Sequence, residues 1–136
     1  MKKLLTGFIT TLLVVQTSFV WADNNAITIL EKSYQTQGAK SGNAQRGEKL
    51  WNKTYSGKAP FTERSCSSCH TSNLKNNGEH VRTGKTLKPL APSVNSASLS
   101  KVKKMKKWFK RNCKWTTGKE CSVQDKADIL AFIKQQ

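Results

Sequence analysis

Two of the four cysteines in this 136-residue chain lie in a five-residue motif that predicts a specific chemistry. The segment Cys66-Ser67-Ser68-Cys69-His70 has the form Cys-x-x-Cys-His, which is the attachment pattern of haem c. Two thiols separated by two residues can form thioethers with both vinyl groups of one haem, and the following imidazole can ligate the iron. The motif predicts one covalent haem c, with Cys66 and Cys69 as haem-binding residues and His70 as the proximal iron ligand.

A Cys-x-x-Cys pair can also serve as a redox dithiol or as half of a zinc site. A thioredoxin-like dithiol needs a strand–helix–strand setting, and the sequence shows no alternating strand pattern. A zinc site would require Cys113 and Cys121 as its second pair, and the seven residues between them are an unusual spacing. The haem interpretation is therefore favoured over both.

If Cys66 and Cys69 hold haem, Cys113 and Cys121 remain as a pair. In an oxidising compartment we expect a Cys113–Cys121 disulfide between the end of one helix and the start of the next, with two free thiols as the alternative. Closing so short a loop stabilises the fold by roughly 2–3 kcal/mol in the chain-entropy estimate.

The first 22 residues have the pattern of a secretory signal peptide. The basic head Met1-Lys2-Lys3 precedes an apolar stretch over 4–20 that is short and polar for a membrane span, and Val20-Trp21-Ala22 offers a cleavage site. We expect removal of residues 1–22, which leaves a monohaem domain over residues 23–136 in a bacterial periplasm, not integral to the membrane. An uncleaved anchor is the alternative.

Composition bounds the function further. Lys and Arg total 24 against 8 Asp and Glu, so the formal net charge is +16, and apolar residues make up 36% of the chain. These values exclude a multidomain enzyme, a polytopic membrane protein and a large unaided core. The periplasm holds no resident nucleic acid, so we do not expect nucleic-acid binding despite the charge.

The elements that must position the motif are short helices joined by long polar connections, which makes the fold class all-α. Residues 56–98 lack periodicity, and a structureless loop of this length is rare unless it wraps around something that completes the core. The pattern indicates about four helices around one covalently bound haem. Apolar spacing predicts them near residues 25–36, 43–55, 101–113 and 123–135.

Local signals refine these helices. Ser100 is the expected N-cap of the third helix, and Ser122 with Asp125 has the spacing of a capping box on the last. Gly47 is expected to let Trp51 and the last helix approach closely. Three aromatic residues are expected to wall the haem pocket: Trp108, Phe109 and Trp115.

The sixth position of the iron decides between two functions. A permanent Met or His ligand is typical of an electron carrier, and the candidates are Met105, on the apolar stripe of a helix, and His80, in a polar loop. A third candidate is Asn112, seven residues after Met105 and therefore on the same helix face. The two lie about 10 Å apart along the axis, so both cannot reach one iron. The residue types alone leave the three candidates open.

A resemblance favours one of them. The pattern resembles class I cytochromes c, and within them the oxygen-binding branch known as sphaeroides haem protein, over roughly residues 43–135. The matching elements are Gly47-x-x-x-Trp51, Cys66-x-x-Cys69-His70, Arg82-Thr83-Gly84-Lys85, Pro89-Leu90-Ala91-Pro92, Lys107-Trp108-Phe109-Lys110-Arg111-Asn112-Cys113 and Cys121.

The resemblance implies that His70 is the proximal ligand, that Asn112 is the distal ligand, and that the two cysteines after it form a disulfide. It also implies that the asparagine leaves the iron on reduction, so that the ferrous site binds a diatomic gas (O2, NO or CO). The implied electron donor is a dihaem cytochrome c or a membrane cytochrome b. The alternative is a plain electron carrier with Met105 or His80 as permanent ligand. No acid–base constellation in the sequence identifies an enzymatic reaction.

Basic residues are concentrated in the predicted 101–113 helix, with eight of them in a run of 14 residues. A solvated helix face accounts for part of this pattern. The concentration also predicts a docking surface for an acidic electron donor, with anionic lipid headgroups as the alternative partner.

Overall fold

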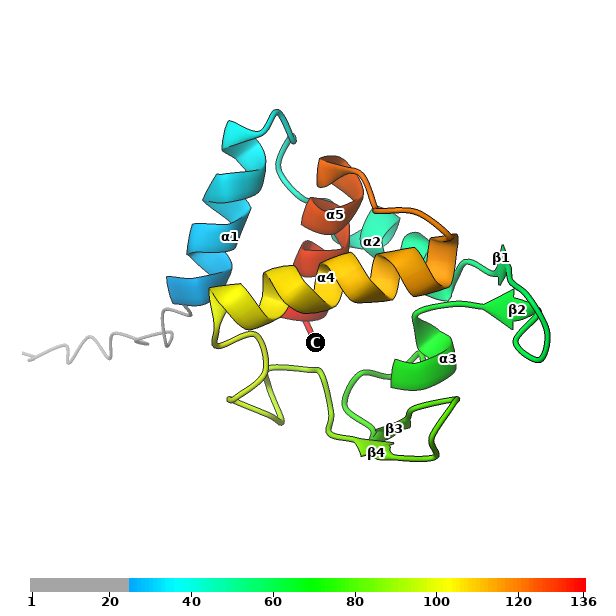
Figure 1. Ribbon diagram of the computed structural model, residues 1–136. Helices are drawn as coiled ribbons and strands as arrows, with labels where there is room; N and C mark the ends of the chain where they lie inside the picture. Colours follow the sequence, from blue (N-terminus) through cyan, green and yellow to red (C-terminus); the bar gives the residue numbers. More distant parts are fainter. Residues whose placement is uncertain (1–24) are drawn as a thin grey trace, which may run out of the picture.

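A computed structural model describes residues 25–136, so the predicted signal peptide over 1–22 lies outside the described residues. The described part of the chain is mainly helical (Figure 1). No helix within it combines the length and apolar character needed to cross a bilayer. The helices are α1 (Asn25–Thr36), α2 (Ala44–Asn52), α3 (Ser67–His70), α4 (Val102–Thr117) and α5 (Val123–Lys134).

The all-α prediction is confirmed, with two small additions. Within residues 25–136, two antiparallel hairpins have strands of two residues each, which is too short to produce an alternating pattern in the sequence. The first hairpin precedes α3 and the second follows it (Figure 1). Their strands are β1 (Tyr55–Ser56) with β2 (Glu63–Arg64), and β3 (Gly78–Glu79) with β4 (Thr86–Leu87).

The predicted capping box on α5 is confirmed. Ser122 Oγ accepts from the Asp125 backbone N–H, and the Asp125 carboxylate accepts from the Ser122 N–H. The predicted Ser100 cap on α4 is wrong. Ser100 Oγ donates to the Ala97 carbonyl instead, at 2.8 Å, and Lys101 occupies the N-cap position without a side-chain bond.

Helices α2 and α5 cross at a glycine, as expected. A Cβ on Gly47 would collide with the Asp128 carbonyl oxygen and with Phe132 Cβ. The close crossing of α2 and α5 brings the Trp51 and Phe132 rings to 6.0 Å between centroids. Both side chains are buried and belong to one core cluster.

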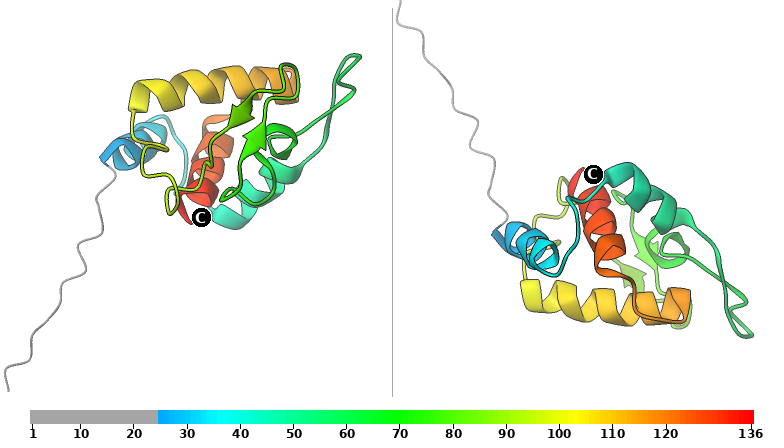
Figure 2. Two further views of the ribbon diagram at one scale, coloured as in Figure 1. Left: turned by 90° about the horizontal axis from the view of Figure 1, so that it is seen from below. Right: turned by 90° about the horizontal axis from the view of Figure 1, so that it is seen from above.

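A second core cluster joins α1, α4 and α5. Helix α4 lies along one edge of the molecule in both views of Figure 2.

A buried carboxylate fixes the same crossing. Asp128 accepts from the Asn43 backbone N–H at 2.8 Å, from two Arg46 nitrogens at 2.8 and 2.9 Å, and from Gln124. Burial alone would raise the pKa of Asp128, but these hydrogen bonds outweigh burial and hold it below the ordinary value.

We expect Asp128→Asn to lower the free energy of unfolding by about 2 kcal/mol at pH 7, because the ionic hydrogen bonds are lost while the shape is kept. A depressed folded-state pKa gives stability that is present above the unfolded pKa of about 3.9 and is lost as the pH falls through the folded value. Urea unfolding at pH 7 and pH 3 measures this, with Glu48→Gln as the exposed control. A variant difference as large at pH 3 as at pH 7 would contradict the account.

Candidate functional site

The Cys-x-x-Cys-His motif forms a single helical turn, α3, that its neighbouring serines hold in place. Ser65 Oγ accepts from the Ser68 backbone N–H, and Ser68 Oγ accepts from the Ser65 N–H, both at 3.0 Å. The two hydroxyls also bond to each other at 2.8 Å. These reciprocal bonds close the turn around Cys66, so both motif cysteines lie on one tight turn.

Trp51 supports the chain where it leaves His70. The indole Nε1 donates to the Thr71 carbonyl at 2.8 Å, and the Trp51 and His70 rings lie 5.7 Å apart between centroids. Thr71 has a positive φ of 63°, a region that residues with a Cβ rarely adopt. The Trp51 hydrogen bond and a bond from Thr71 Oγ1 to the Asn73 carbonyl hold this backbone. Trp51 therefore links the α2–α5 crossing to the histidine of the motif.

Strand β3 packs directly on the motif at Gly78. A Cβ on Gly78 would collide with the Cys69 carbonyl oxygen and would lie 3.0 Å from His70 Cα. The contact is with backbone atoms, which cannot move aside as a flexible side chain can. Glycine at this position therefore lets the β3–β4 hairpin press against the turn that carries His70.

We expect Gly78→Ala to displace the His70 turn and to destabilise the protein by about 1–3 kcal/mol, the usual cost of overpacking. The thermal midpoint and the yield of haem-loaded protein measure the effect. Asn77→Ala, at the exposed neighbouring position, is the matched control. Equal midpoints and haem yields for the two variants would show that the contact is relaxed at no cost.

Burial shifts the pKa values of the thiol and the imidazole of the motif in opposite directions. Burial, followed by the nearby Cys69, raises the pKa of the Cys66 thiol to about 11, although the Thr116 hydroxyl lies within hydrogen-bonding reach and lowers it. Burial and the nearby His80 lower the pKa of His70. This shift favours the neutral imidazole, which is the form that ligates a metal.

Positions 105, 109, 112 and 116 of α4 share one face of that helix. Met105 and Thr116 are buried, with 6% and 2% of their surface exposed, and Phe109 is half-buried. Asn112 lies between them on the same face but is exposed. Thr116 reaches Cys66, and Asn112 precedes Thr116 by four residues, about 6 Å along the axis. Asn112 therefore lies on the same helix face as Thr116, one turn away from the α4 residue beside the motif.

The structure puts the other two candidate ligands in different surroundings. Met105 is buried in the core cluster of α1, α4 and α5, together with Leu30 and Tyr34. His80 follows β3, and its Nδ1 lies 3.0 Å from the Thr83 hydroxyl in the connection to β4. His80 lies near His70, in the connection of the β3–β4 hairpin, whose strand β3 packs on α3.

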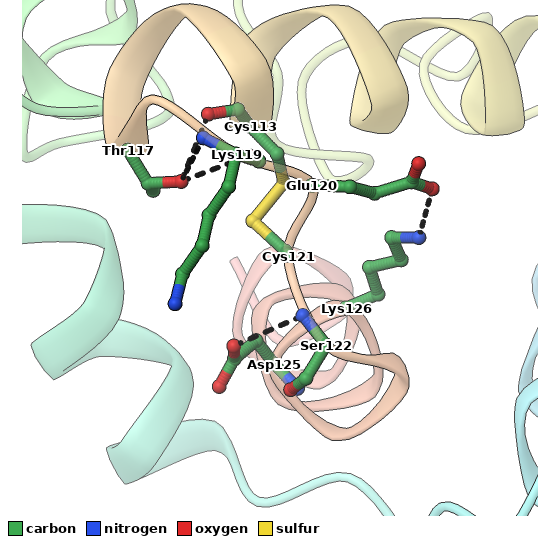
Figure 3. The surroundings of a disulfide bond; sticks show 8 residues. All are labelled: Cys113, Thr117, Lys119, Glu120, Cys121, Ser122, Asp125 and Lys126. Carbon is green, nitrogen blue, oxygen red and sulfur yellow. Dashed lines mark hydrogen bonds and ion pairs between the residues drawn. A yellow bond between two sulfur atoms is a disulfide. The ribbon is translucent and has the colours of Figure 1, made fainter.

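The predicted disulfide is present. Cys113 and Cys121 are bonded, and the bond joins the last turns of α4 to the segment before α5 (Figure 3). Lys126 Nζ pairs with Glu120 at 2.7 Å beside it. Helix α4 extends to Thr117, four residues beyond the predicted end, and Gly118 ends it in the left-handed conformation with φ of 79°. The residue after Asn112 is therefore fixed to the start of α5.

The prediction that Trp108 walls a haem pocket stays a prediction. Trp108 is 43% exposed, and the Arg111 guanidinium lies 5.1 Å from its ring centroid on the outside of α4. Trp115 is half-buried instead, under the Arg64 guanidinium at 4.9 Å, and Arg64 also donates to the Trp115 carbonyl. Arg64 thereby connects the first hairpin to the end of α4. No local pattern in the sequence predicted this contact.

Comparison with known proteins bears on this arrangement directly. A family described as a domain of unknown function, DUF1924, matches residues 37–133. The cytochrome c-type protein SHP of Cereibacter sphaeroides is 35% identical over 103 residues, which are 76% of this chain and 78% of that protein. The chain is a class I c-type cytochrome of the DUF1924 family.

Two solved structures in this group share the fold. Oxidised SHP, described as an oxygen-binding cytochrome c, superposes with a TM-score of 0.74 at 34% identity, over 81% of this chain and 96% of that one. The solution structure of cytochrome c'' from Methylophilus methylotrophus, described in connection with haem-ligand detachment, gives 0.71 at 27% identity, over 84% and 96%.

Membership in this family of cytochromes implies covalently bound haem c, and the donor set fits it. The two thiols of Cys66 and Cys69 lie on one turn, His70 follows directly on the same turn, and few side chains of residues 56–98 are buried.

Proposed function

We propose that this cytochrome is a periplasmic monohaem protein in which Asn112 ligates the oxidised iron and leaves it on reduction, so that a diatomic gas can bind. One observation carries the proposal: Asn112 lies on the buried stripe of α4, one turn before the Thr116 that reaches Cys66, and still has an exposed amide. Haem c, when bound by Cys66, Cys69 and His70, supplies an iron that exchanges one electron and takes a small ligand at its sixth position.

The chemistry of the amide accounts for the switch. An amide oxygen is a weak, hard donor, so it suits ferric iron better than the softer ferrous iron. Reduction would therefore weaken a bond from Asn112 to the iron and open the position. The Asn112 amide N–H could then donate a hydrogen bond to a polarised diatomic ligand, because α4 would keep the side chain nearby. The Cys113–Cys121 disulfide limits how far α4 can move at the residue next to Asn112.

The electron that opens the site must come from another protein, and the proposed donor is a dihaem cytochrome c or a membrane cytochrome b. The description of one relative as an oxygen-binding cytochrome c and of another in terms of haem-ligand detachment supports the proposal. The surroundings of Met105, buried among α1 side chains, weigh against a permanent methionine ligand.

Visible and electron paramagnetic resonance spectra of the oxidised protein test the ligand. Asn112→Ala is expected to change the ferric spectrum to that of a water-ligated or high-spin iron. Met105→Leu and His80→Gln are expected to leave it unchanged. A ferric spectrum that changes in Met105→Leu or His80→Gln, and not in Asn112→Ala, would make the protein a plain electron carrier with that residue as its ligand.

A further inference from the structure

The outer face of α4 carries a dense positive charge, which Glu120 approaches only near Lys110 and Lys114. Residues 101–114 include no acidic side chain, and all eight of their basic residues are exposed. The ion pairs found within residues 25–136 involve Arg46, Lys126 and Lys134, so none neutralises a basic residue of this face. We call these residues the α4 basic face: Lys101, Lys103, Lys104, Lys106, Lys107, Lys110, Arg111 and Lys114.

An exposed aromatic residue lies at the edge of the α4 basic face. Trp108 is 43% exposed although the other large apolar residue types of α4 point inward, and Arg111 stacks 5.1 Å from its ring centroid. Trp and Arg are the residue types most enriched among the energetically dominant positions of protein interfaces. Trp108 precedes Asn112 by one helical turn, so this pair adjoins the side of α4 that faces the motif.

We propose that the α4 basic face, with Trp108 at its edge, is the docking surface for an acidic electron-donor protein. The inference rests on the proposed function, because it assumes that the protein receives an electron. A positive field spread along α4 accelerates encounter with an acidic partner, and the acceleration falls as salt screens the field. Docking here brings the donor to the helix that carries Asn112 and, through Thr116, contacts Cys66.

The structure favours a protein partner over an anionic membrane. A helix that lies on a membrane inserts a continuous apolar face below the headgroups. On α4 the apolar residues Met105 and Phe109 face the core, and Trp108 is the single large exposed apolar side chain of this helix. Its ring is covered on one side by the charged Arg111, which suits a protein contact with carboxylates around an aromatic anchor.

Stopped-flow reduction by an acidic haem protein tests the proposal, with the soluble domain of cytochrome b5 as the probe. The holoprotein variant Lys103→Glu/Lys107→Glu/Lys110→Glu lowers the net charge of the face from +8 to +2 without touching Trp108 or Asn112. The control Lys32→Glu/Lys49→Glu/Lys58→Glu makes the same change in net charge on exposed positions of α1, α2 and the first hairpin.

We expect the second-order rate constant at low salt to fall at least about tenfold in the α4 variant and to lose most of its salt dependence, with a much smaller change in the control. Trp108→Ala is expected to weaken the dissociation constant for oxidised cytochrome b5, measured by calorimetry, with little effect on salt dependence. Reduction by hexaammineruthenium(II), a small cation, should not slow in any variant.

Two results would overturn the proposal. Equal rate losses in the α4 variant and the control would show that net charge alone matters. Rates with cytochrome b5 that match the wild type in both variants, combined with sedimentation on phosphatidylglycerol vesicles that is lost only in the α4 variant, would assign the face to a membrane surface. A carbon monoxide spectrum recorded on the same reduced samples separates the two claims, because it reports on the gas site and not on docking.

Discussion

Replacing both motif cysteines, as Cys66→Ser/Cys69→Ser, is expected to abolish the folded state. Between β2 and α4 the core receives only a few fully buried apolar side chains, chiefly Leu74 and Ala91. A covalently held haem must supply the remaining apolar surface for this segment. A small domain is stable by roughly 5–15 kcal/mol, and loss of its largest core component exceeds the lower part of that range.

Circular dichroism at 222 nm and the Soret absorbance of the purified protein measure this loss. The expected result is no Soret band and no cooperative thermal transition. Ser67→Ala, which removes a hydroxyl between the two cysteines and neither thiol, is the control and should retain both signals. A double variant that unfolds cooperatively at the wild-type midpoint would show that the chain builds its core without haem.

Asn112→His is expected to close the gas site. An imidazole ligates ferrous iron as well as ferric iron, so it would stay bound on reduction where the amide leaves. If the histidine occupies the iron 99% of the time, the apparent affinity for carbon monoxide falls about 100-fold. If position 112 reaches the iron as proposed, the substitution needs no change of the α4 backbone.

Carbon monoxide titration of the reduced protein measures this effect, with Asn112→Ala as the matched variant. We expect Asn112→Ala to bind carbon monoxide at least as tightly as the wild type, because it removes the competing side chain. Unchanged carbon monoxide affinity in Asn112→His would mean that position 112 does not reach the iron.

The sequence predicted those parts of the fold that depend on neighbouring residues. The capping box of Ser122 and Asp125 is a local pattern, and so is the apolar spacing that located α1, α4 and α5. The Cys113–Cys121 pairing followed from counting cysteines. The Ser100 cap failed because a serine hydroxyl has a competing local acceptor, the Ala97 carbonyl, which the pattern does not weigh.

The parts of the site that were missed depend on segments far apart in the chain. Thr116 of α4 comes near Cys66 only in the folded chain, and Gly78 matters because a hairpin folds back onto the motif. Trp108 was expected beside a haem pocket, and in the structure it is 43% exposed with the Arg111 guanidinium 5.1 Å from its ring centroid. Periodicity predicts that a residue is near a face boundary and does not decide on which side it packs.

The visible spectrum of the reduced wild-type protein, before and after addition of carbon monoxide, tests the central claim most directly. If Asn112 leaves the iron on reduction, the reduced spectrum is high-spin and shifts at once when carbon monoxide is added. A sharp low-spin reduced spectrum that carbon monoxide does not alter would contradict the account. It would mean that a permanent ligand holds the iron and that the protein carries electrons without binding a gas.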